Sequence, residues 1–203
     1  MKLGIFGGTF DPIHNGHLFV AEQARLLENL DKVLFVPTNN QHYRDKAHAS
    51  VEHRCAMILG AISTNRGFAL DDSDLRDDAT GYTADLIPRL HAKYPDATFT
   101  FLIGADSLVN SEWVRFDEVL ESLERFCIAP RPGVRADALA RVIGVVPHHL
   151  RERVNTLNMP AVTDSATLIR AQLGQGRSVR YLVPEPVWQY VVSQKLYGYE
   201  GTA

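Results

Sequence analysis

The chain has 203 residues, of which 45% are hydrophobic, and a formal net charge of −3 at pH 7. This length and apolar content suffice for one medium-sized domain with a buried core, and the absence of excess positive charge argues against nucleic acid as a partner. The sequence contains no run of about eighteen apolar residues and no secretory signal pattern, so we expect no membrane partner and a cytoplasmic location.

The N-terminal segment combines a strand pattern with features of a phosphate-binding loop. An apolar run over residues 2–6 predicts a buried strand, and Gly7-Gly8 after it provide a permissive backbone that a ligand can approach closely. Apolar residues recur at helical spacing between 18 and 27, which places His14 and His17 at or just before a helix start. Free backbone N–H groups and the positive end of the helix dipole favour an anion there.

Two histidines three residues apart do not by themselves identify this chemistry. The same spacing is compatible with solvated or capping imidazoles, and with a metal site. The glycine pair before His14 and the helix after His17 favour a phosphate site, because both imidazoles can then face one ligand.

Strand and helix patterns alternate along the rest of the chain. Ser50 is expected to cap a helix, and Pro88 predicts a late start or a kink in the helix that begins near Thr83. The acidic stretch 71–80 is expected to be a solvated loop. Further strands are predicted at 33–37, 68–70, 98–103, 126–129 and 154–159, and further helices at 165–173 and from 184 on.

This alternation predicts an α/β fold. We expect a Rossmann-like, doubly wound and mostly parallel sheet with helices on both faces. In such a sheet ligands bind at the carboxyl ends of the strands, where the candidate residues lie. No linker divides the sequence, so we expect a single domain over residues 1–203, with a small C-terminal helical part from about residue 160.

A second polar cluster opens the predicted helix at 165–173. Ser165 and Thr167 provide two hydroxyls at the helix start, and Arg170 adds a guanidinium one turn later. Such groups can hold a polyphosphate through hydroxyls, backbone amides and a bidentate fork. Hydroxyls at a helix start are also common as plain caps, so the cluster gains weight from its pairing with the first one.

The order of motifs along the chain resembles a known family. Gly-Gly-Thr-Phe-Asp-Pro-Ile-His-Asn-Gly-His at 7–17 is similar to the signature of the nucleotidyltransferase superfamily with the HxGH motif. Further motifs make the chain resemble bacterial nicotinate-nucleotide adenylyltransferases over nearly its whole length. These motifs are Glu52-His53-Arg54, Tyr82-Thr83-x-Asp85, Ile103-Gly104-Ala105-Asp106 with Trp113, Ala129-Pro130-Arg131-Pro132-Gly133, Ser165-x-Thr167-x-x-Arg170 and Arg180-Tyr181-Leu182-Val183-Pro184.

The resemblance implies transfer of the adenylyl group of ATP to nicotinate mononucleotide, giving deamido-NAD and pyrophosphate in NAD biosynthesis. Mg²⁺ would accompany ATP without dedicated protein ligands, the partners would be these small molecules, and a homo-oligomer is compatible with the family. The implied catalytic residues are His14, His17 and Arg170. The implied ATP-binding residues are Gly7, Gly8, Thr9, Phe10, His14, His17, Gly104, Asp106, Ser165, Thr167 and Arg170. The implied nicotinate mononucleotide-binding residues are Asn39, Arg44, Tyr82, Thr83, Trp113 and Arg131.

Some of these residue types have common structural roles as well. Trp113 is also compatible with a core aromatic, Asp106 with an N-cap, and the arginines of loops with solvated side chains. Two rival functions remain at this stage. One keeps the chemistry and takes nicotinamide mononucleotide or another nucleotide-like phosphate as acceptor, and the other is a non-catalytic nucleotide-binding regulatory module.

The chain departs from the family pattern at three places. Gln41-His42-Tyr43-Arg44 stands where the family usually has a proline-rich segment of the Pro-Pro-His-Lys type. Ala166 replaces the middle residue of the usual Ser-Ser-Thr, which removes one hydroxyl. Asp164 adds a negative charge close to the implied triphosphate site.

Overall fold

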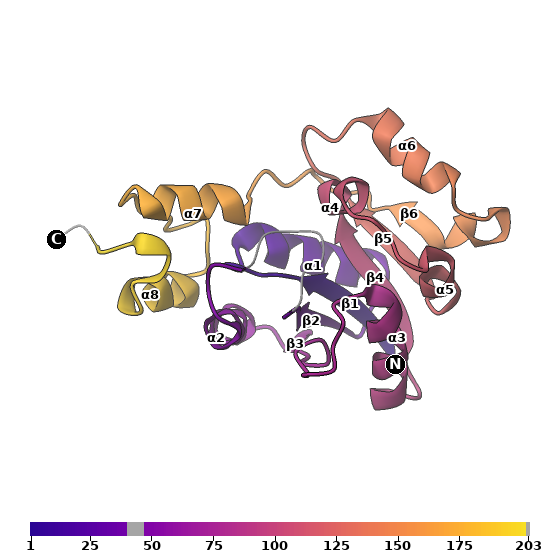
Figure 1. Ribbon diagram of the computed structural model, residues 1–203, viewed down its shortest axis with the longest axis horizontal. Coiled ribbons are helices and arrows are strands. Elements are labelled where there is room, and N and C mark those ends of the chain that lie inside the picture. Colours follow the sequence, from indigo (N-terminus) through magenta and orange to yellow (C-terminus); the bar gives the residue numbers. More distant parts are fainter. Residues whose placement is uncertain (40–46, 202–203) are drawn as a thin grey trace.

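The computed structural model describes residues 1–39 and 47–201, in which a parallel sheet lies between two layers of helices (Figure 1). The strands are β1 Lys2–Gly8, β2 Lys32–Pro37, β3 Phe68–Leu70, β4 Thr98–Gly104, β5 Arg125–Ala129 and β6 Val154–Thr156. The α-helices are α1 Asn15–Leu27, α2 Val51–Ile62, α3 Thr83–Lys93, α4 Ala105–Asn110, α5 Phe116–Glu121, α6 Ala136–Gly144, α7 Ala166–Gly174 and α8 Glu185–Ser193, with short 3₁₀ helices η1 His148–Arg153 and η2 Leu196–Gly198.

Among the described residues, the sheet has the strand order β3-β2-β1-β4-β5-β6, and each pair of neighbouring strands is parallel. The order runs outward in one direction from β1 and in the other from β4, so the winding reverses between these two strands. Their register aligns Phe6 with Leu102. The predicted α/β, doubly wound fold with a parallel sheet is confirmed.

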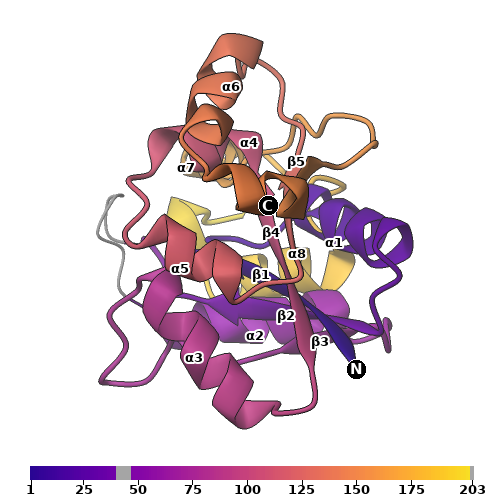
Figure 2. The same ribbon diagram turned by 90° about the vertical axis from the view of Figure 1, so that its right-hand side faces the viewer.

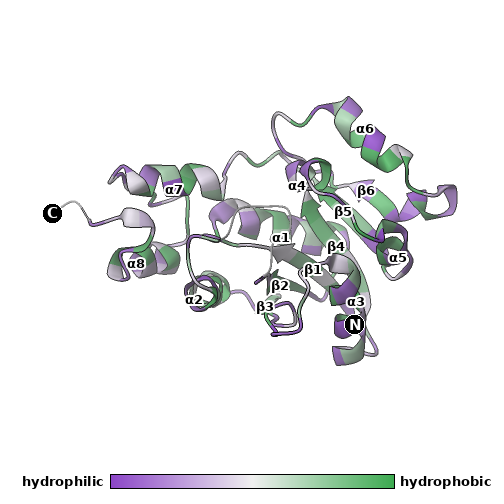
Figure 3. Cartoon of the chain, in the orientation of Figure 1, coloured by the Kyte–Doolittle hydropathy of each residue, from purple (hydrophilic) through white to green (hydrophobic). Residues whose placement is uncertain are grey.

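Alternating side chains of the central strands fill two apolar clusters, one on each face of the sheet. Leu3 and Ile5 of β1 contact the cluster beneath α3, α4 and α5, whereas Phe6 belongs to the cluster beneath α1 and α2. Figure 2 shows α3 and α5 on one side of the sheet and α1 on the other. Coloured by hydropathy, the apolar residues concentrate along the strands and on the sheet-facing sides of the helices (Figure 3).

The C-terminal helices extend the cluster on the α1 and α2 face. Ile169 and Leu173 of α7 and Val187 of α8 are fully buried in it, and α8 packs against α2. In Figure 1 both helices lie beside α2 and α1, far from β6. The segment from about residue 160 therefore shares its core with the N-terminal half of the sheet.

Two local expectations differ from the structure. The helix α3 starts at Thr83 and continues through Pro88 as one element, so the late start is wrong, whereas the kink stays a prediction. The acidic stretch 71–80 is not uniformly solvated, because Asp71, Ser73 and Asp74 are buried within it. Among the described residues, no helix is long and apolar enough to cross a membrane.

Candidate active site

A cleft of about 970 Å³ lies where the winding of the sheet reverses. The last residues of the two central strands, Gly8 of β1 and Gly104 of β4, both line it. Parallel strands point their carboxyl ends to one edge, and at the reversal the connections diverge to opposite faces, which leaves a crevice. The cleft therefore lies at the sheet edge where the sequence predicts a ligand.

The segment between β1 and α1 has an unusual backbone conformation at Phe10 and no room for a side chain at Gly16. Gly7 and Gly8 are extended residues at the end of β1, so they belong to the strand and not to the turn. Phe10 adopts the left-handed conformation of the turn (φ 51°), and its ring is buried. At Gly16 a side chain is excluded, because a Cβ atom there would lie 2.5 Å from Val162 Cγ1.

His14 and His17 form a reciprocal cap at the start of α1. The His17 backbone N–H donates to His14 Nδ1 at 3.3 Å, and the His14 backbone N–H donates to His17 Nδ1 at 3.2 Å. The rings stack with centroids 3.6 Å apart at an angle of 25°. Because each Nδ1 accepts a backbone hydrogen, the proton of each ring lies on Nε2. Both rings also line the cleft, so capping and ligand contact are compatible here.

Burial keeps His14 uncharged. Its side chain is 3% exposed, and this desolvation, followed by the positive charge of Arg131, lowers the pKa of His14 to about 3. Two stacked neutral imidazoles avoid the repulsion that two imidazolium rings would have at this distance. The pair can donate N–H groups to an anion without changing its protonation.

The backbone amides at the start of α1 are less available than the sequence suggested. The Asn15 N–H donates to the carbonyl oxygen of Leu182 at 2.9 Å, and those of His14 and His17 donate within the reciprocal cap. The expectation of several free N–H groups at this helix start is therefore wrong for these three residues. The imidazoles, rather than these amides, present donors to the cleft.

Asp11 holds the loop between β1 and α1 through buried hydrogen bonds, a role that its place in the motif does not predict. Its carboxylate is 2% exposed and accepts from the backbone N–H of His48 at 2.7 Å, from that of Ala49 at 3.1 Å and from the Tyr197 hydroxyl at 2.8 Å. Its carbonyl oxygen accepts from Arg170 Nη1 at 2.7 Å. Asp11 thus connects the loop to the N-terminal side of α2, to η2 and to α7.

Arg54 of α2 supports the same loop from the interior. Its side chain is 1% exposed, and Nη1 donates to the Thr9 carbonyl oxygen at 2.8 Å. Burial lowers the pKa of Arg54, while the negative charge of Asp11 opposes that shift. The motif at 52–54 contains Arg54, but its burial beneath the loop is visible only in the fold.

The second polar cluster, at the start of α7, contacts the first, and both line the cleft. Ser165 is the N-cap of α7, and its Oγ accepts from the Leu168 N–H at 3.2 Å, so the capping alternative is correct. Arg170 Nη2 donates to Thr167 Oγ1 at 3.4 Å, while Nη1 reaches Asp11. Ser165, Thr167 and Arg170 all line the cleft together with the histidine pair. A cap hydroxyl that accepts one hydrogen bond can still donate its own proton.

The opposite wall of the cleft carries Tyr82, Thr83 and Trp113. Thr83 is the first residue of α3, with Tyr82 as the N-cap, and Trp113 lies between α4 and α5. The indole packs edge-on against Phe101 and Phe126, with centroids 6.0 and 5.3 Å away. Trp113 is thus a core aromatic and a cleft residue at once.

Asp106 and Arg131 form an ion pair within the cleft, with Arg131 Nε 3.4 Å from Asp106 Oδ1. The N-cap of α4 is Gly104, so the N-cap alternative for Asp106 is wrong. Arg131 Nη1 also donates to the carbonyl oxygens of Val162 and Asp164, both at 2.8 Å. Arg131 therefore braces the segment that leads into α7.

Asp74 is a cleft residue that the sequence analysis missed. It was assigned to a solvated acidic stretch, but it is 7% exposed and lines the cleft. Burial raises the pKa of Asp74 to about 6, against the opposing effects of a hydrogen bond from Thr38 and the charge of Arg89. A run of aspartates cannot reveal which member the fold buries, because Thr38 and Arg89 lie far away in the sequence.

The cleft brings together most of the predicted site residues. Asn39 is exposed and is not among the residues that line the cleft, and Arg44, with the departure at 41–44, lies outside the described residues. The Asp164 side chain does not line it either. The predicted residues that line the cleft are Gly7, Gly8, Thr9, Phe10, His14, His17, Tyr82, Thr83, Gly104, Asp106, Trp113, Arg131, Ser165, Thr167 and Arg170.

Within the described part of the chain, three or more His, Cys, Asp or Glu side chains do not gather in a way that could hold a metal ion.

Comparison with known proteins places the chain among nucleotidyltransferases. The cytidylyltransferase-like family model matches residues 5–172. A relative from Exiguobacterium sibiricum, named probable nicotinate-nucleotide adenylyltransferase, is 38% identical over 97% of this chain and 99% of its own length. A relative of the same name from Oceanobacillus iheyensis is 36% identical over 98% of this chain and 97% of its own length.

Solved structures with low sequence identity have the same fold. The nicotinic acid mononucleotide adenylyltransferase of Plasmodium falciparum, complexed with NaAD, superposes with a TM-score of 0.77 at 19% identity, covering 98% of both chains. A putative nicotinate-nucleotide adenylyltransferase from Vibrio parahaemolyticus gives a TM-score of 0.68 at 20% identity, covering 97% of this chain and 94% of the other.

Proposed function

The chain belongs to the cytidylyltransferase-like family, among relatives named nicotinate-nucleotide adenylyltransferases, and we propose that it transfers the adenylyl group of ATP to nicotinate mononucleotide. The products are deamido-NAD and pyrophosphate. One observation carries the proposal. The capped histidine pair, the cluster around Arg170 and the wall with Thr83 and Trp113 all line the same cleft. We call residues 7–17 and 165–170 the phosphate half, and residues 80–83 and 113–115 the acceptor half.

In the phosphate half, the reaction needs positioning and charge stabilisation more than covalent help. A phosphate oxygen of the mononucleotide attacks the α-phosphorus of ATP, the bond from that phosphorus to the bridging oxygen breaks, and pyrophosphate leaves. We assign to His14 and His17 the donation of Nε2–H to phosphoryl oxygens on which charge builds. Arg170, with Ser165 and Thr167 beside it, would hold the outer phosphates.

The acceptor half would bind the pyridine ring. We assign ring stacking to Trp113, whose indole is held edge-on by core phenylalanines, and contact with the ring carboxylate to the backbone near Thr83 at the start of α3. Asp106 and Arg131, paired at 3.4 Å, also line the cleft and are candidates for ribose and phosphate contacts.

A divalent metal typically accompanies ATP in this class of enzyme, and we propose Mg²⁺. Mg²⁺ is usually coordinated by substrate phosphate oxygens and water, so the phosphate chain of ATP would hold it in the phosphate half. When bound, the metal neutralises charge on the phosphate chain. The residues of the phosphate half orient that chain.

The acceptor could instead be nicotinamide mononucleotide, which differs by a carboxamide in place of the carboxylate. An uncharged amide forgoes the favourable electrostatics of a helix start, which supports the acid as the preferred acceptor. The regulatory-module alternative would retain binding without turnover, and the intact histidine pair and Arg170 support an active enzyme.

A pyrophosphate-release assay tests the proposal. Wild-type protein receives ATP and Mg²⁺ with either nicotinate or nicotinamide mononucleotide. We expect release that depends on the mononucleotide and is faster with the acid. Preference for the amide would select the rival acceptor, and no release with either acceptor would contradict an adenylyltransferase function.

A further inference from the structure

The two walls of the acceptor half come from separate elements, and neither wall is part of the sheet. Thr83 begins α3, whereas Trp113 lies between α4 and α5. A planar ring that stacks on one wall and contacts the other requires a fixed distance between them. The contacts between the walls therefore bear directly on how the acceptor half binds its ligand.

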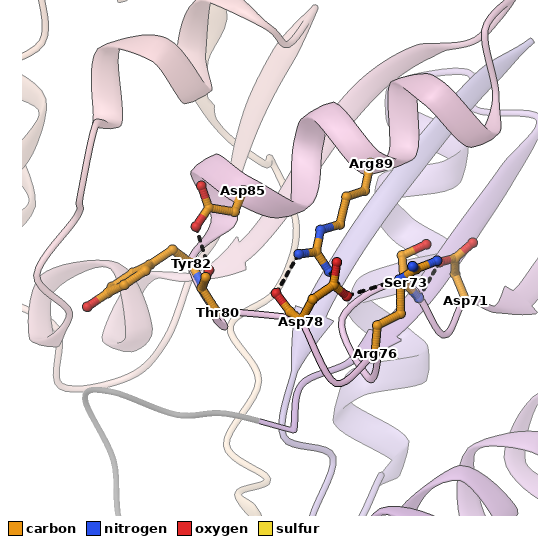
Figure 4. Close-up of polar contacts among 8 residues, drawn as sticks. All are labelled: Asp71, Ser73, Arg76, Asp78, Thr80, Tyr82, Asp85 and Arg89. Carbon is orange, nitrogen blue, oxygen red and sulfur yellow. Dashed lines mark hydrogen bonds and ion pairs between the residues drawn. The ribbon is translucent and has the colours of Figure 1, made fainter.

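One carboxylate reaches both walls. Asp85, in the first turn of α3, accepts from the Arg115 guanidinium through Oδ1, and from the Thr80 hydroxyl at 2.5 Å through Oδ2. The same hydroxyl oxygen accepts from the Tyr82 N–H at 3.3 Å. Figure 4 shows Asp85 reaching toward Thr80 while the Tyr82 ring extends away from the Arg89 contacts. Arg115 is thus connected through Asp85 to the backbone just before Thr83.

Arg115 is placed to transmit this contact to Trp113. It follows the tryptophan by two residues, adopts a left-handed conformation (φ 53°) and is the N-cap of α5 without a side-chain cap hydrogen bond. The Trp113 ring is held in place by its edge-on packing against Phe101 and Phe126 of the core. Its backbone on the C-terminal side is tied to α3 by the Arg115–Asp85 pair.

The rest of the 71–82 loop is anchored to α3 by other contacts. Arg89 Nη1 lies 3.3 Å from Asp78 Oδ1 and Nη2 donates to the Asp78 carbonyl oxygen at 2.7 Å, as Figure 4 shows. Lys93 lies 3.0 Å from the buried Asp71 carboxylate. These contacts do not involve Asp85 or Arg115, so the loop should keep its fold without the pair.

From this arrangement we propose that Asp85 and Arg115 are positioning residues that set the spacing of the acceptor half. This inference rests on the proposed function. Their side chains are 30% and 42% exposed, so the pair contributes little to overall stability, and its effect is on the relative placement of the two walls.

The test compares Arg115→Gln, Asp85→Asn and the double variant with matched controls in α6. There Arg135 is also a helix N-cap and pairs with Asp137, a first-turn aspartate, at 2.9 Å, outside the cleft. The control variants are Arg135→Gln and Asp137→Asn. Initial rates of pyrophosphate release give KM for each substrate and kcat, and thermal unfolding checks the fold.

We expect Arg115→Gln and Asp85→Asn each to raise KM for nicotinate mononucleotide by about five- to tenfold, with KM for ATP changed less than about twofold. Because the pair acts as a unit, the KM of the double variant should be close to that of the more impaired single variant. Arg115→Lys keeps the positive charge and should recover part of the loss. The controls should match wild type.

Unchanged KM for the mononucleotide in both single variants would overturn the proposal, as would equal rises in both KM values or additive effects in the double variant. If wild-type protein releases no pyrophosphate with either mononucleotide, the proposed function fails and this inference fails with it. Wild-type activity together with insensitive variants would reject the positioning role alone.

Discussion

The phosphate half and the acceptor half of the cleft differ in how their residues are anchored. In the 7–17 segment of the phosphate half, Asp11 and His14 are at most 3% exposed, as is Arg54 beneath this segment, and their contacts are mostly with backbone groups. In the acceptor half, the walls are joined by Asp85 and Arg115, which are 30% and 42% exposed. Buried contacts with backbone stabilise a geometry strongly, whereas a half-exposed ion pair contributes less free energy to the geometry it holds.

This difference matches the chemistry proposed for each half. Stabilisation of charge on a reacting phosphate depends on donors that do not reorganise, so a rigid cradle is favoured. The acceptor ring is bound without being chemically changed, so a weaker contact that keeps the spacing of its two walls is sufficient there. The comparison predicts that substitutions in the phosphate half reduce kcat or stability strongly, and that substitutions in the acceptor half mainly change KM.

The largest effect on kcat is expected at His17, which tests whether its Nε2–H donates to a phosphoryl oxygen. Loss of the Nε2 donor in His17→Ala should lower kcat at least about a hundredfold, with the fold retained by circular dichroism. His17→Asn separates the two roles of the ring, because its amide can accept from the His14 N–H in place of Nδ1 but has no group at the position of Nε2.

Both His17 variants should therefore be impaired to a similar degree. Recovery of kcat in His17→Asn would mean that His17 acts as a cap and not as a donor to phosphate. His149→Ala is the matched control, because His149 is 70% exposed, lies near Glu121 and does not line the cleft.

Asp11→Asn tests whether the phosphate half depends on its buried carboxylate. An amide nitrogen cannot accept the hydrogens that His48, Ala49 and Tyr197 donate, so a buried donor is left facing another donor. Urea unfolding at pH 7 should show a loss of about 2–3 kcal/mol. Asp137→Asn is the exposed control, and its free energy of unfolding should change by less than about 0.5 kcal/mol. An equally small loss in Asp11→Asn would show that the buried carboxylate does not stabilise the loop.

Two buried titratable groups of the cleft, His14 and Asp74, respond to pH in opposite directions. The pKa of His14 is lowered to about 3, so the folded protein binds fewer protons than the unfolded chain below pH 6.5 and loses stability as pH falls through this range. The pKa of Asp74 is raised from 3.8 to about 6. For Asp74 the folded protein binds more protons, and stability decreases as pH rises from about 4 to 6.

Asp74→Asn isolates this smaller effect, because asparagine resembles the protonated carboxyl group at every pH. The variant should match wild type near pH 4 and exceed it by about 2 kcal/mol at pH 8. Urea unfolding across this range measures the difference. A stability difference that is independent of pH would show that the Asp74 carboxyl group is not held in the unfavourable environment that its burial implies.

The sequence predicted the fold well because each strand and helix carries a local pattern. The run at 2–6, the cap at Ser50 and the alternation along the chain are short-range signals. What it missed depends on partners distant in sequence. The buried Asp74 carboxyl group has a hydrogen bond with Thr38, and the backbone N–H of Asn15 donates to the carbonyl oxygen of Leu182.

The candidate site shows the same division. The motifs at 7–17 and 165–170 identified residues that line one cleft, because each motif is contiguous. The supporting residues Asp11 and Arg54 have no distinct local signal, since a buried aspartate and a solvated one look alike in a sequence. Asn39, assigned to the acceptor, is exposed and away from the lining residues.

Labelled ATP tests the central claim most directly. The protein is incubated with Mg²⁺, nicotinate mononucleotide and ATP carrying radioactive phosphorus at either the α or the γ position, and the products are separated. The account predicts that the α label appears in the dinucleotide and the γ label in pyrophosphate. Transfer of the γ label to the mononucleotide, with formation of ADP, would contradict it.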